Sequence, residues 1–294
     1  MGRVAEVARI ICDSGLCYAL GASGKAIWQK FYPSFKRHPL ASLSVIIISH
    51  NEAHNIQACL HCVAFADQVV VLDSGSTDDT VQLARAMGAS VSTSPDWPGF
   101  GIQKNRALAL ASSDWVLSID ADERVTPALQ AEIQAVLKAP AFDAYDFPRL
   151  SSYCGQYMHH SGWYPDRVTR LFRRQTARFS DDLVHEKLLV SSPLGALNSD
   201  LLHESFRDLE SVLDKVNRYS SAGAQALHNK GKTSSLGKAL GHGLWAFVRT
   251  YFLQRGFLDG QRGLVLAISN AEGTYYRYLK LWLLLEQKTF PPSS

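Results

Sequence analysis

The sequence predicts an α/β fold with a mostly parallel sheet, followed by a helical C-terminal region. Two apolar, β-branched runs, 43–49 and 68–72, are continuous rather than alternating, as expected of strands buried on both faces. Each run is followed by a segment with helical spacing, and short strand–helix units favour a parallel sheet. Between Asp208 and Leu227, apolar residues recur at i, i+3 and i+4 steps, which indicates a long helix.

The elements follow one another in a regular order. The first strand stops at His50-Asn51-Glu52, and the second ends in 73–78, where Gly75 supplies a turn and the residues after it can cap a helix. A third apolar run ends abruptly in Asp120-Ala121-Asp122. The predicted elements are strands at 43–49, 68–72, 90–92 and 115–119 and helices at 55–65, 79–87 and 208–227.

Four acidic residues lie at the carboxyl ends of these strands: Glu52, Asp73, Asp120 and Asp122. Parallel strands place their carboxyl ends at one edge of a sheet, where ligands of such folds bind. Two close carboxylates repel each other, and a shared divalent cation removes that cost. Mg²⁺ and Mn²⁺ take oxygen ligands and share them with a substrate diphosphate. Asp-x-Asp alone is a weak signal, since most such pairs are solvated loop acids, but four acids on one edge are harder to dismiss.

Several segments together resemble glycosyltransferase family 2, whose nucleotide-sugar-binding domain has the Rossmann-like GT-A fold. The resemblance is carried by SVIIISHNE at 44–52, VVVLDSGSTDDT at 69–80, GIQKNRAL at 101–108 and WVLSIDADE at 115–123. It continues through 162–166, 170–174, 184–186, 251–253 and 255–260, in a pattern similar to the bacterial subgroup that adds glucose to the heptose region of lipopolysaccharide core.

The resemblance implies an inverting hexosyltransferase with a single-displacement mechanism. It implies UDP-glucose as donor and an inner-core heptose of lipopolysaccharide, linked to lipid A, as acceptor. Asp122, together with Asp120, would hold the Mg²⁺ or Mn²⁺ ion that neutralises the diphosphate, and Asp73 and Glu52 would contact the base and ribose. A different hexose or another cell-surface glycan acceptor stays open, because donor identity depends on pocket shape.

The catalytic base and the phosphate-binding side chains have candidates too. The resemblance favours Glu186 as base, with Asp182 as its rival, and burial beside His185 would raise the proton affinity of Glu186 as catalysis requires. Arg170 could clamp a phosphate, although a strand with alternating exposed arginines explains it equally simply. The remaining candidates for the nucleotide pocket wall are Lys104 and Arg106, whose alternative is an exposed helix start.

Composition and cysteine usage exclude several classes of protein. Hydrophobic residues make up 46% and charged residues 19%, which excludes a disordered chain, and a net charge of +3 gives no reason to expect a nucleic-acid partner. Five scattered cysteines give no disulfide framework, which favours a reducing cytosol. Cys59 and Cys62 could suggest a zinc or redox site, but they lie within a predicted helix without a second ligand pair, so packing is favoured.

The sequence divides into an N-terminal extension at 1–40, a transferase domain at 41–227 and a basic aromatic tail at 228–294. No uninterrupted apolar stretch reaches the roughly 20 residues that a membrane span needs. Aromatic residues mixed with Lys and Arg in the tail favour helices lying on an anionic membrane, and the alternative is a helical cap on the domain. We therefore expect a peripheral protein on the cytoplasmic face of the inner membrane.

Two other functions share parts of this pattern. A sugar nucleotidyltransferase needs a glycine-rich phosphate loop after the first strand, and Ser49-His50-Asn51-Glu52 cannot supply it. A non-catalytic protein that binds nucleotide sugars or glycans would be expected to lack one of the acids, whereas all four are present.

Overall fold

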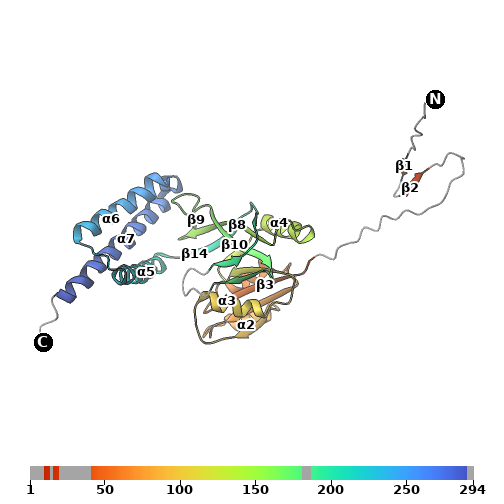
Figure 1. Cartoon of the computed structure of the whole chain (residues 1–294), viewed down its shortest axis with the longest axis horizontal. Helices are drawn as coiled ribbons and strands as arrows, with labels where there is room; N and C mark the ends of the chain where they lie inside the picture. The colour runs from red at the N-terminus through yellow and green to blue at the C-terminus, as the bar shows by residue number, and fades with distance from the viewer. Residues whose placement is uncertain (1–9, 14–15, 20–40, 181–186, 290–294) are drawn as a thin grey trace, which may run out of the picture. The chain divides into compact units, whose positions relative to one another are not determined.

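A computed structural model describes residues 10–13, 16–19, 41–180 and 187–289 of the chain (Figure 1). The chain forms two compact units, residues 1–39 and 40–294. In the first unit, β1 (Ile10–Asp13) and β2 (Leu16–Ala19) form an antiparallel pair. All the residues predicted to have a functional role lie in the second unit.

The second unit contains a mixed sheet with the strand order β5-β4-β3-β6-β10-β8-β14-β7. Its first four strands are parallel: β5 (Ser90–Thr93), β4 (Gln68–Asp73), β3 (Leu43–Ser49) and β6 (Trp115–Asp120). Every residue of β3 is buried, as expected for a central parallel strand covered on both faces. The expected α/β domain with a mostly parallel sheet and a helical C-terminal region is thus confirmed.

The remaining strands extend this sheet. β10 (Asp166–Arg173) runs antiparallel to both β6 and β8 (Ala144–Tyr153), and β14 (Leu201–Phe206) runs parallel to β8 and antiparallel to β7 (Glu123–Val125). Two short strands, β9 (Gln156–Tyr157) and β13 (Leu194–Ala196), pair with β8, while β11 (Ala177–Phe179) and β12 (Leu188–Val190) form a separate ribbon.

Helices cover both faces of the parallel half. One core cluster joins the sheet to α1 (Ile56–Cys62), α2 (Thr80–Ala86) and α4 (Pro127–Lys138), and a second joins the opposite face to α3 (Phe100–Ala109). Cys59 is fully buried in the first cluster and Cys62 packs against it, so packing, the favoured role, is confirmed. Thr126 begins α4 by accepting a hydrogen bond from the Leu129 N–H, with Pro127 at the first helical position.

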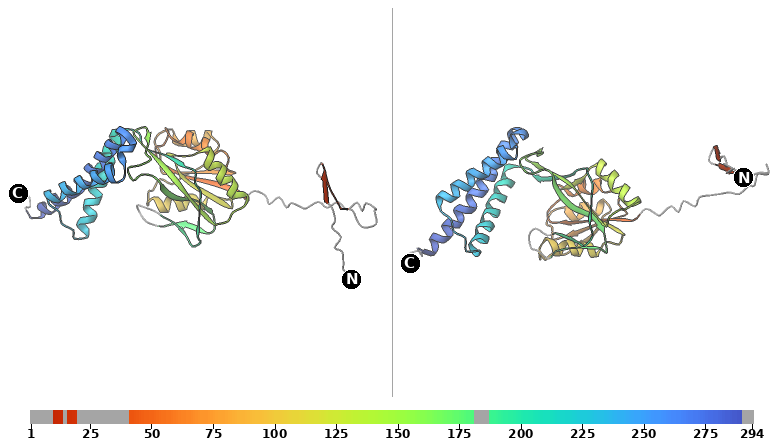
Figure 2. Two further views of the ribbon diagram at one scale, coloured as in Figure 1. Left: turned by 90° about the horizontal axis from the view of Figure 1, so that it is seen from above. Right: turned by 45° about the horizontal axis from the view of Figure 1, so that its top comes forward.

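Three long helices follow the sheet. They are α5 (Leu209–Asn229), α6 (Leu236–Val248) and α7 (Gly260–Thr289), with a π-helix η1 (Arg249–Leu253) and a 3₁₀-helix η2 (Gly256–Asp259) between α6 and α7. α7 lies between α5 and α6 and packs against both (Figure 2). The helix predicted at 208–227 is therefore present, and its packing on α7 makes it part of the helical layer. Among the described helices, none is both long and apolar enough to cross a bilayer.

A buried carboxylate ties the helical layer to the sheet. Asp259 in η2 accepts hydrogen bonds from the backbone N–H groups of His159 and His160 and from the Ser161 hydroxyl, at 2.8–3.1 Å. Nearby, the Tyr153 hydroxyl at the end of β8 bonds the Ser269 hydroxyl of α7 at 2.8 Å. These contacts hold α7 against the end of the long central strand β8.

Candidate functional site

The acids predicted at the strand ends come together at one edge of the sheet. Strand register sets Asp73 beside Ser49 and Asp120 beside Ile48, on the two sides of β3. A cavity of about 200 Å³ opens at this edge, and Glu52, Asp120 and Asp122 line it. Its other lining residues are Ile48, Ser49, Trp97, Phe100, Ala121 and His203.

Asp73 shapes the turn after β4. Its carboxylate is almost fully buried and accepts hydrogen bonds from the Ser49 hydroxyl and from the backbone N–H groups of Gly75 and Ser76, at 2.8–3.1 Å. Gly75 has a φ of +87°, a conformation that favours glycine. Within the described residues Asp73 thus organises the loop beside the cavity, and its contact with a nucleotide stays a prediction.

Glu52 lies on the other side of this loop, partly exposed. Its carboxylate accepts a hydrogen bond from the Asn55 amide at 2.9 Å. Burial raises its pKa, and the nearby charge of Asp122 adds to that rise. Two carboxylates that already repel each other would gain from a cation or from a ribose hydroxyl donor between them.

Asp120 is held by two cations. One carboxylate oxygen lies 3.0 Å from Lys104 Nζ and the other 2.7 Å from Arg170 Nη2. Burial by itself would raise the pKa of Asp120, but the charges of Arg170 and Lys104 outweigh it and hold the pKa well below its ordinary value. Lys104 is 2% exposed, so of its two predicted environments, pocket wall or exposed helix start, the structure has the buried one.

Glu123 completes this charge network, although the sequence analysis assigned no role to it. Its side chain is fully buried and lies 3.0 Å from Arg170 and 3.2 Å from Arg149, and it also accepts the Asp120 N–H. Arg170 is therefore buried between two carboxylates rather than exposed on its strand. The signal available in the sequence was the acid immediately after Asp-x-Asp, which could only be interpreted once β10 was known to pair with β6.

Asp122 faces a histidine that sequence reasoning missed. His203 Nε2 on β14 lies 3.3 Å from an Asp122 carboxylate oxygen, and its Nδ1 lies 2.9 Å from the Ser151 hydroxyl. A hydrogen bond at one ring nitrogen orients the other, as in metal sites. Neighbouring ligands of an octahedral cation at about 2.1 Å lie about 3 Å apart. Asp122 and His203 therefore fit as two ligands of one divalent cation.

The rest of such a coordination shell would have to come from elsewhere, because the described residues contain no group of three or more His, Cys, Asp or Glu able to hold a metal. The oxygen-rich diphosphate of a substrate is the usual complement for Mg²⁺. Asp120 already uses both carboxylate oxygens on Lys104 and Arg170, so the described contacts favour Asp122 as the ligand of the two.

Arg106 points elsewhere. Its guanidinium pairs with Asp96, at 2.8 Å for each of two contacts, and with the Ser94 hydroxyl at 2.7 Å. The hydrogen bonds from Arg106 and Ser94 lower the pKa of Asp96 to about 2. Arg106 therefore steadies the loop after β5, next to Trp97, rather than lining either cavity at the sheet edge among the described residues.

A second, larger cavity of about 530 Å³ adjoins the first and shares Asp120 and Phe100 with it. Its lining is strongly cationic, with Arg149, Arg167, Arg170 and Lys187. Together the two cavities offer a carboxylate and an imidazole beside several guanidinium groups, an arrangement suited to a metal-bound diphosphate. The predicted bases Glu186 and Asp182 lie outside the described residues.

Comparisons with known proteins identify the family of this chain. The model of glycosyl transferase family 2 matches residues 44–189, which include all four predicted acids. The uncharacterized glycosyltransferase RP128 of Rickettsia prowazekii is 31% identical over 255 residues, covering 82% of this chain and 87% of the relative. The lipopolysaccharide core biosynthesis glycosyltransferase LpsC of Rhizobium meliloti is 31% identical over 261 residues, covering 82% and 94%.

Among solved structures, residues 1–349 of S. aureus TarS are similar with a TM-score of 0.42 at 17% identity, covering 84% of this chain and 87% of that one. The sequence relatives extend well beyond the sheet, into the helical layer that follows it. This chain belongs to glycosyltransferase family 2 and is a glycosyltransferase.

Proposed function

We propose that the enzyme transfers glucose from UDP-glucose to an inner-core heptose of lipopolysaccharide, in an inverting single displacement. The observation that carries the proposal is the pairing of Asp122 with His203 at the edge of the sheet, next to the cationic cavity of Arg149, Arg167 and Arg170. The similarity to LpsC, a lipopolysaccharide core biosynthesis glycosyltransferase, supports the acceptor class.

Each described residue has a role in this proposal. Asp122 and His203 would hold Mg²⁺ or Mn²⁺, which neutralises charge on the departing diphosphate when bound. Arg170 and Lys104 fix Asp120 so that its carboxylate does not compete for the ion. Glu52 borders the space for ribose and base, with Trp97 and Phe100 as its apolar wall, and Asp73 organises the loop beside it. Glu186, or Asp182, removes the proton of the acceptor hydroxyl.

The donor half of the proposal is tested by calorimetric titration of the full chain with UDP, with and without Mn²⁺. We expect Mn²⁺ to tighten UDP binding, and both Asp122→Ala and His203→Ala to abolish that gain while leaving metal-free binding unchanged. Arg106→Gln serves as the control, because its guanidinium is engaged with Asp96 outside both cavities. UDP binding that is indifferent to Mn²⁺ in the wild-type protein would contradict the metal assignment.

The surface of the helical layer supports a location at a membrane. α6 exposes Leu236, Leu240 and Leu244 at four-residue spacing, and Trp245 beside them is 56% exposed. Residues 230–286 contain eight Lys and Arg against three Asp and Glu. Exposed leucine and tryptophan side chains in a basic helical segment fit the interface of an anionic membrane. We propose that this face rests on the cytoplasmic side of the inner membrane, where a lipid-linked acceptor is available.

Co-sedimentation with vesicles tests the membrane proposal. We expect the full chain to bind vesicles containing an anionic phospholipid, and the double variant Leu244→Glu/Trp245→Glu to bind at least tenfold more weakly. Leu110→Glu is the matched control, since Leu110 is also exposed, at 42%, but follows α3 in the transferase domain. Equal loss of binding in this control would show that charge, and not the α6 face, determines the interaction.

A further inference from the structure

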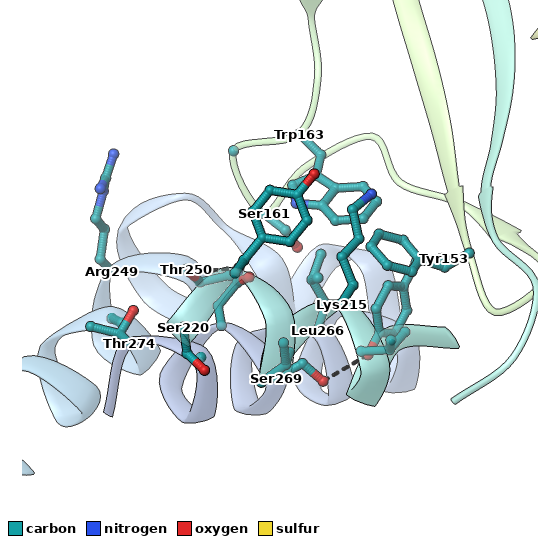
Figure 3. Close-up of a pocket in the computed structure, with 18 of the residues that line it drawn as sticks. Tyr153, Ser161, Trp163, Lys215, Ser220, Arg249, Thr250, Leu266, Ser269 and Thr274 are labelled. Atoms are coloured by element: carbon teal, nitrogen blue, oxygen red, sulfur yellow. Dashed lines mark hydrogen bonds between the residues drawn. The ribbon is translucent and has the colours of Figure 1, made fainter. Parts of the chain in front are cut away.

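A third cavity, of about 430 Å³, lies where the helical layer meets the ends of β8 and β14 (Figure 3). We call it the interhelical cavity, and its lining comes from α5, the α6–η1 junction, α7 and the loop at 161–163. Its volume falls in the range of small-molecule sites. Neither the Asp122–His203 pair nor the cationic cavity described above accounts for this third cavity.

One wall of the interhelical cavity is aromatic. Tyr153, Trp163 and Phe206 form a cluster whose ring centroids lie 5.8–5.9 Å apart. Trp163 lines the cavity and keeps part of its surface exposed. Flat apolar ring faces offer a platform for the C–H face of a sugar, and polar groups around them can fix its orientation.

The polar groups of the interhelical cavity include three cations. Lys215 Nζ lies over the Phe206 ring at 4.4 Å and the Tyr219 ring at 5.8 Å. Arg249 and Arg277 also line the cavity, and Figure 3 shows Arg249 at the end away from Lys215. None of these three cations forms an ion pair with a carboxylate of the described residues. Burial lowers the pKa of Lys215, because it disfavours the charged form.

The π-helix η1 also contributes to the lining of the interhelical cavity. A π-helix is rare and is frequently found at functional sites. Here it carries Arg249 and Thr250 into the lining, and the Thr250 hydroxyl accepts a hydrogen bond from the Asn270 amide at 3.3 Å. Cationic, hydroxyl and amide groups facing an aromatic platform suit a ligand that is both a sugar and an anion.

The interhelical cavity reaches toward the edge of the sheet. Tyr219 lines both this cavity and the cationic cavity that contains Asp120 and Arg170. A ligand bound beside Lys215 can therefore present a hydroxyl toward Asp122 and His203, the proposed ligands of the cation.

We propose that the interhelical cavity is the acceptor site and that it takes a saccharide carrying a phosphate or carboxylate group. The proposal rests on the transferase function proposed above, because the ligand is assigned as acceptor from its position. Lys215 binds the anionic group, and Trp163 supports the sugar ring.

Calorimetric titration of the full chain tests this assignment, with mannose 6-phosphate, mannose and inorganic phosphate as probes. Saturating UDP is present, so that no probe occupies the donor cavity. We expect mannose 6-phosphate to bind at least tenfold more tightly than either mannose or inorganic phosphate. Lys215→Met should weaken mannose 6-phosphate binding about tenfold and leave mannose binding unchanged, because a charged hydrogen bond is lost.

The matched control is Lys230→Met, which makes the same change at an exposed position at the end of α5. Lys215→Glu is a second variant and should weaken mannose 6-phosphate binding further, because it reverses the charge. Equal affinity for mannose and its phosphate, or unchanged mannose 6-phosphate binding in both Lys215 variants, would overturn the proposal. Tighter Lys215-dependent binding to anionic vesicles than to the phosphosugar would overturn it too, since the cavity would then take a lipid headgroup.

Kinetics separate this proposal from the transferase function. With a lipopolysaccharide acceptor, Lys215→Met should raise the acceptor KM at least tenfold and leave the donor KM unchanged. If the wild-type protein fails to bind UDP yet binds mannose 6-phosphate through Lys215, the proposed function fails and the anionic-saccharide ligand stands. If UDP binds with Mn²⁺ and the phosphosugar does not, the interhelical cavity proposal alone fails.

Discussion

Asp120→Asn is the substitution whose effect can be worked out most fully from the structure. The carboxylate joins the end of β6 to α3 through Lys104 and to β10 through Arg170, at 3.0 and 2.7 Å. Asparagine keeps the shape and one oxygen acceptor but loses the charge and the second acceptor. Lys104 would stay buried at 2% exposure with less compensation for its charge.

The expected cost follows from these contacts. A hydrogen bond to a charged group contributes about 1.5–3 kcal/mol, whereas breaking a fully buried ion pair costs about 3–5 kcal/mol. Asp120 is 30% exposed, which brings the loss to the lower part of this range. We therefore expect Asp120→Asn to reduce the free energy of unfolding by about 2–3 kcal/mol, or roughly 5–10 °C in Tm for a domain of this size.

The pH dependence gives the prediction a second, independent readout. The folded-state pKa of Asp120 lies below its unfolded value, so its contribution is present above about pH 4 and is lost as the pH falls. The difference in unfolding free energy between wild type and Asp120→Asn should be full at pH 7 and shrink below pH 4.

Urea unfolding followed by tryptophan fluorescence measures both effects. Asp143→Asn is the control, because its ion pair with Arg173 is about 40% exposed on both sides and should contribute at most about 0.5–1 kcal/mol. If Asp120→Asn unfolds like this control, or if its effect is the same at pH 3.5 and pH 7, the buried ion-pair network does not stabilise the site as argued.

Three further predictions concern other parts of the chain. Gly195→Ala should reduce the free energy of unfolding by about 1–3 kcal/mol and lower Tm, because the new methyl would lie 2.3 Å from a packed tyrosine ring. Gly237→Ala, on the open face of α6, should instead raise the free energy of unfolding by about 0.5–1 kcal/mol. A rise in Tm for both variants would refute the packing argument. Asp259→Asn should cost about 2–4 kcal/mol in urea unfolding, since its amide would face N–H donors that the carboxylate now satisfies, and faster hydrogen exchange in η2 should accompany the loss. Glu186→Gln should slow sugar transfer at least 100-fold with UDP affinity unchanged, and normal turnover in this variant together with loss in Asp182→Asn would reverse the assignment of the base.

The parallel half of the sheet could be predicted because each of its strands has a recognisable pattern in its own local sequence. A strand buried on both faces is a continuous apolar run, so β3 and β4 were recognisable without knowledge of their partners. Parallel strands also share one edge, and for that reason the acids at their ends could be grouped in advance. The long helix α5 was predicted for a similar reason, since its apolar spacing is local.

The antiparallel half could not be predicted in the same way. His203 reaches Asp122 only because β14 pairs with β7 and β8, and these pairings join residues about 50–80 positions apart. Arg170 appeared as one of several alternating arginines, and only the pairing of β10 with β6 buries it against Asp120. The interhelical cavity depends in turn on how α5 and α7 pack at the end of β8, which no single segment of sequence specifies.

The most direct test of the account is the position of Mn²⁺ in crystals grown with UDP, located by anomalous scattering. We predict one peak at the sheet edge, within coordination distance of Asp122 and His203, with Asp120 still bonded to Lys104 and Arg170. A peak on Asp120 with its two cations displaced, or no bound Mn²⁺ when UDP is present, would contradict the central claim that Asp122 and His203 hold the ion.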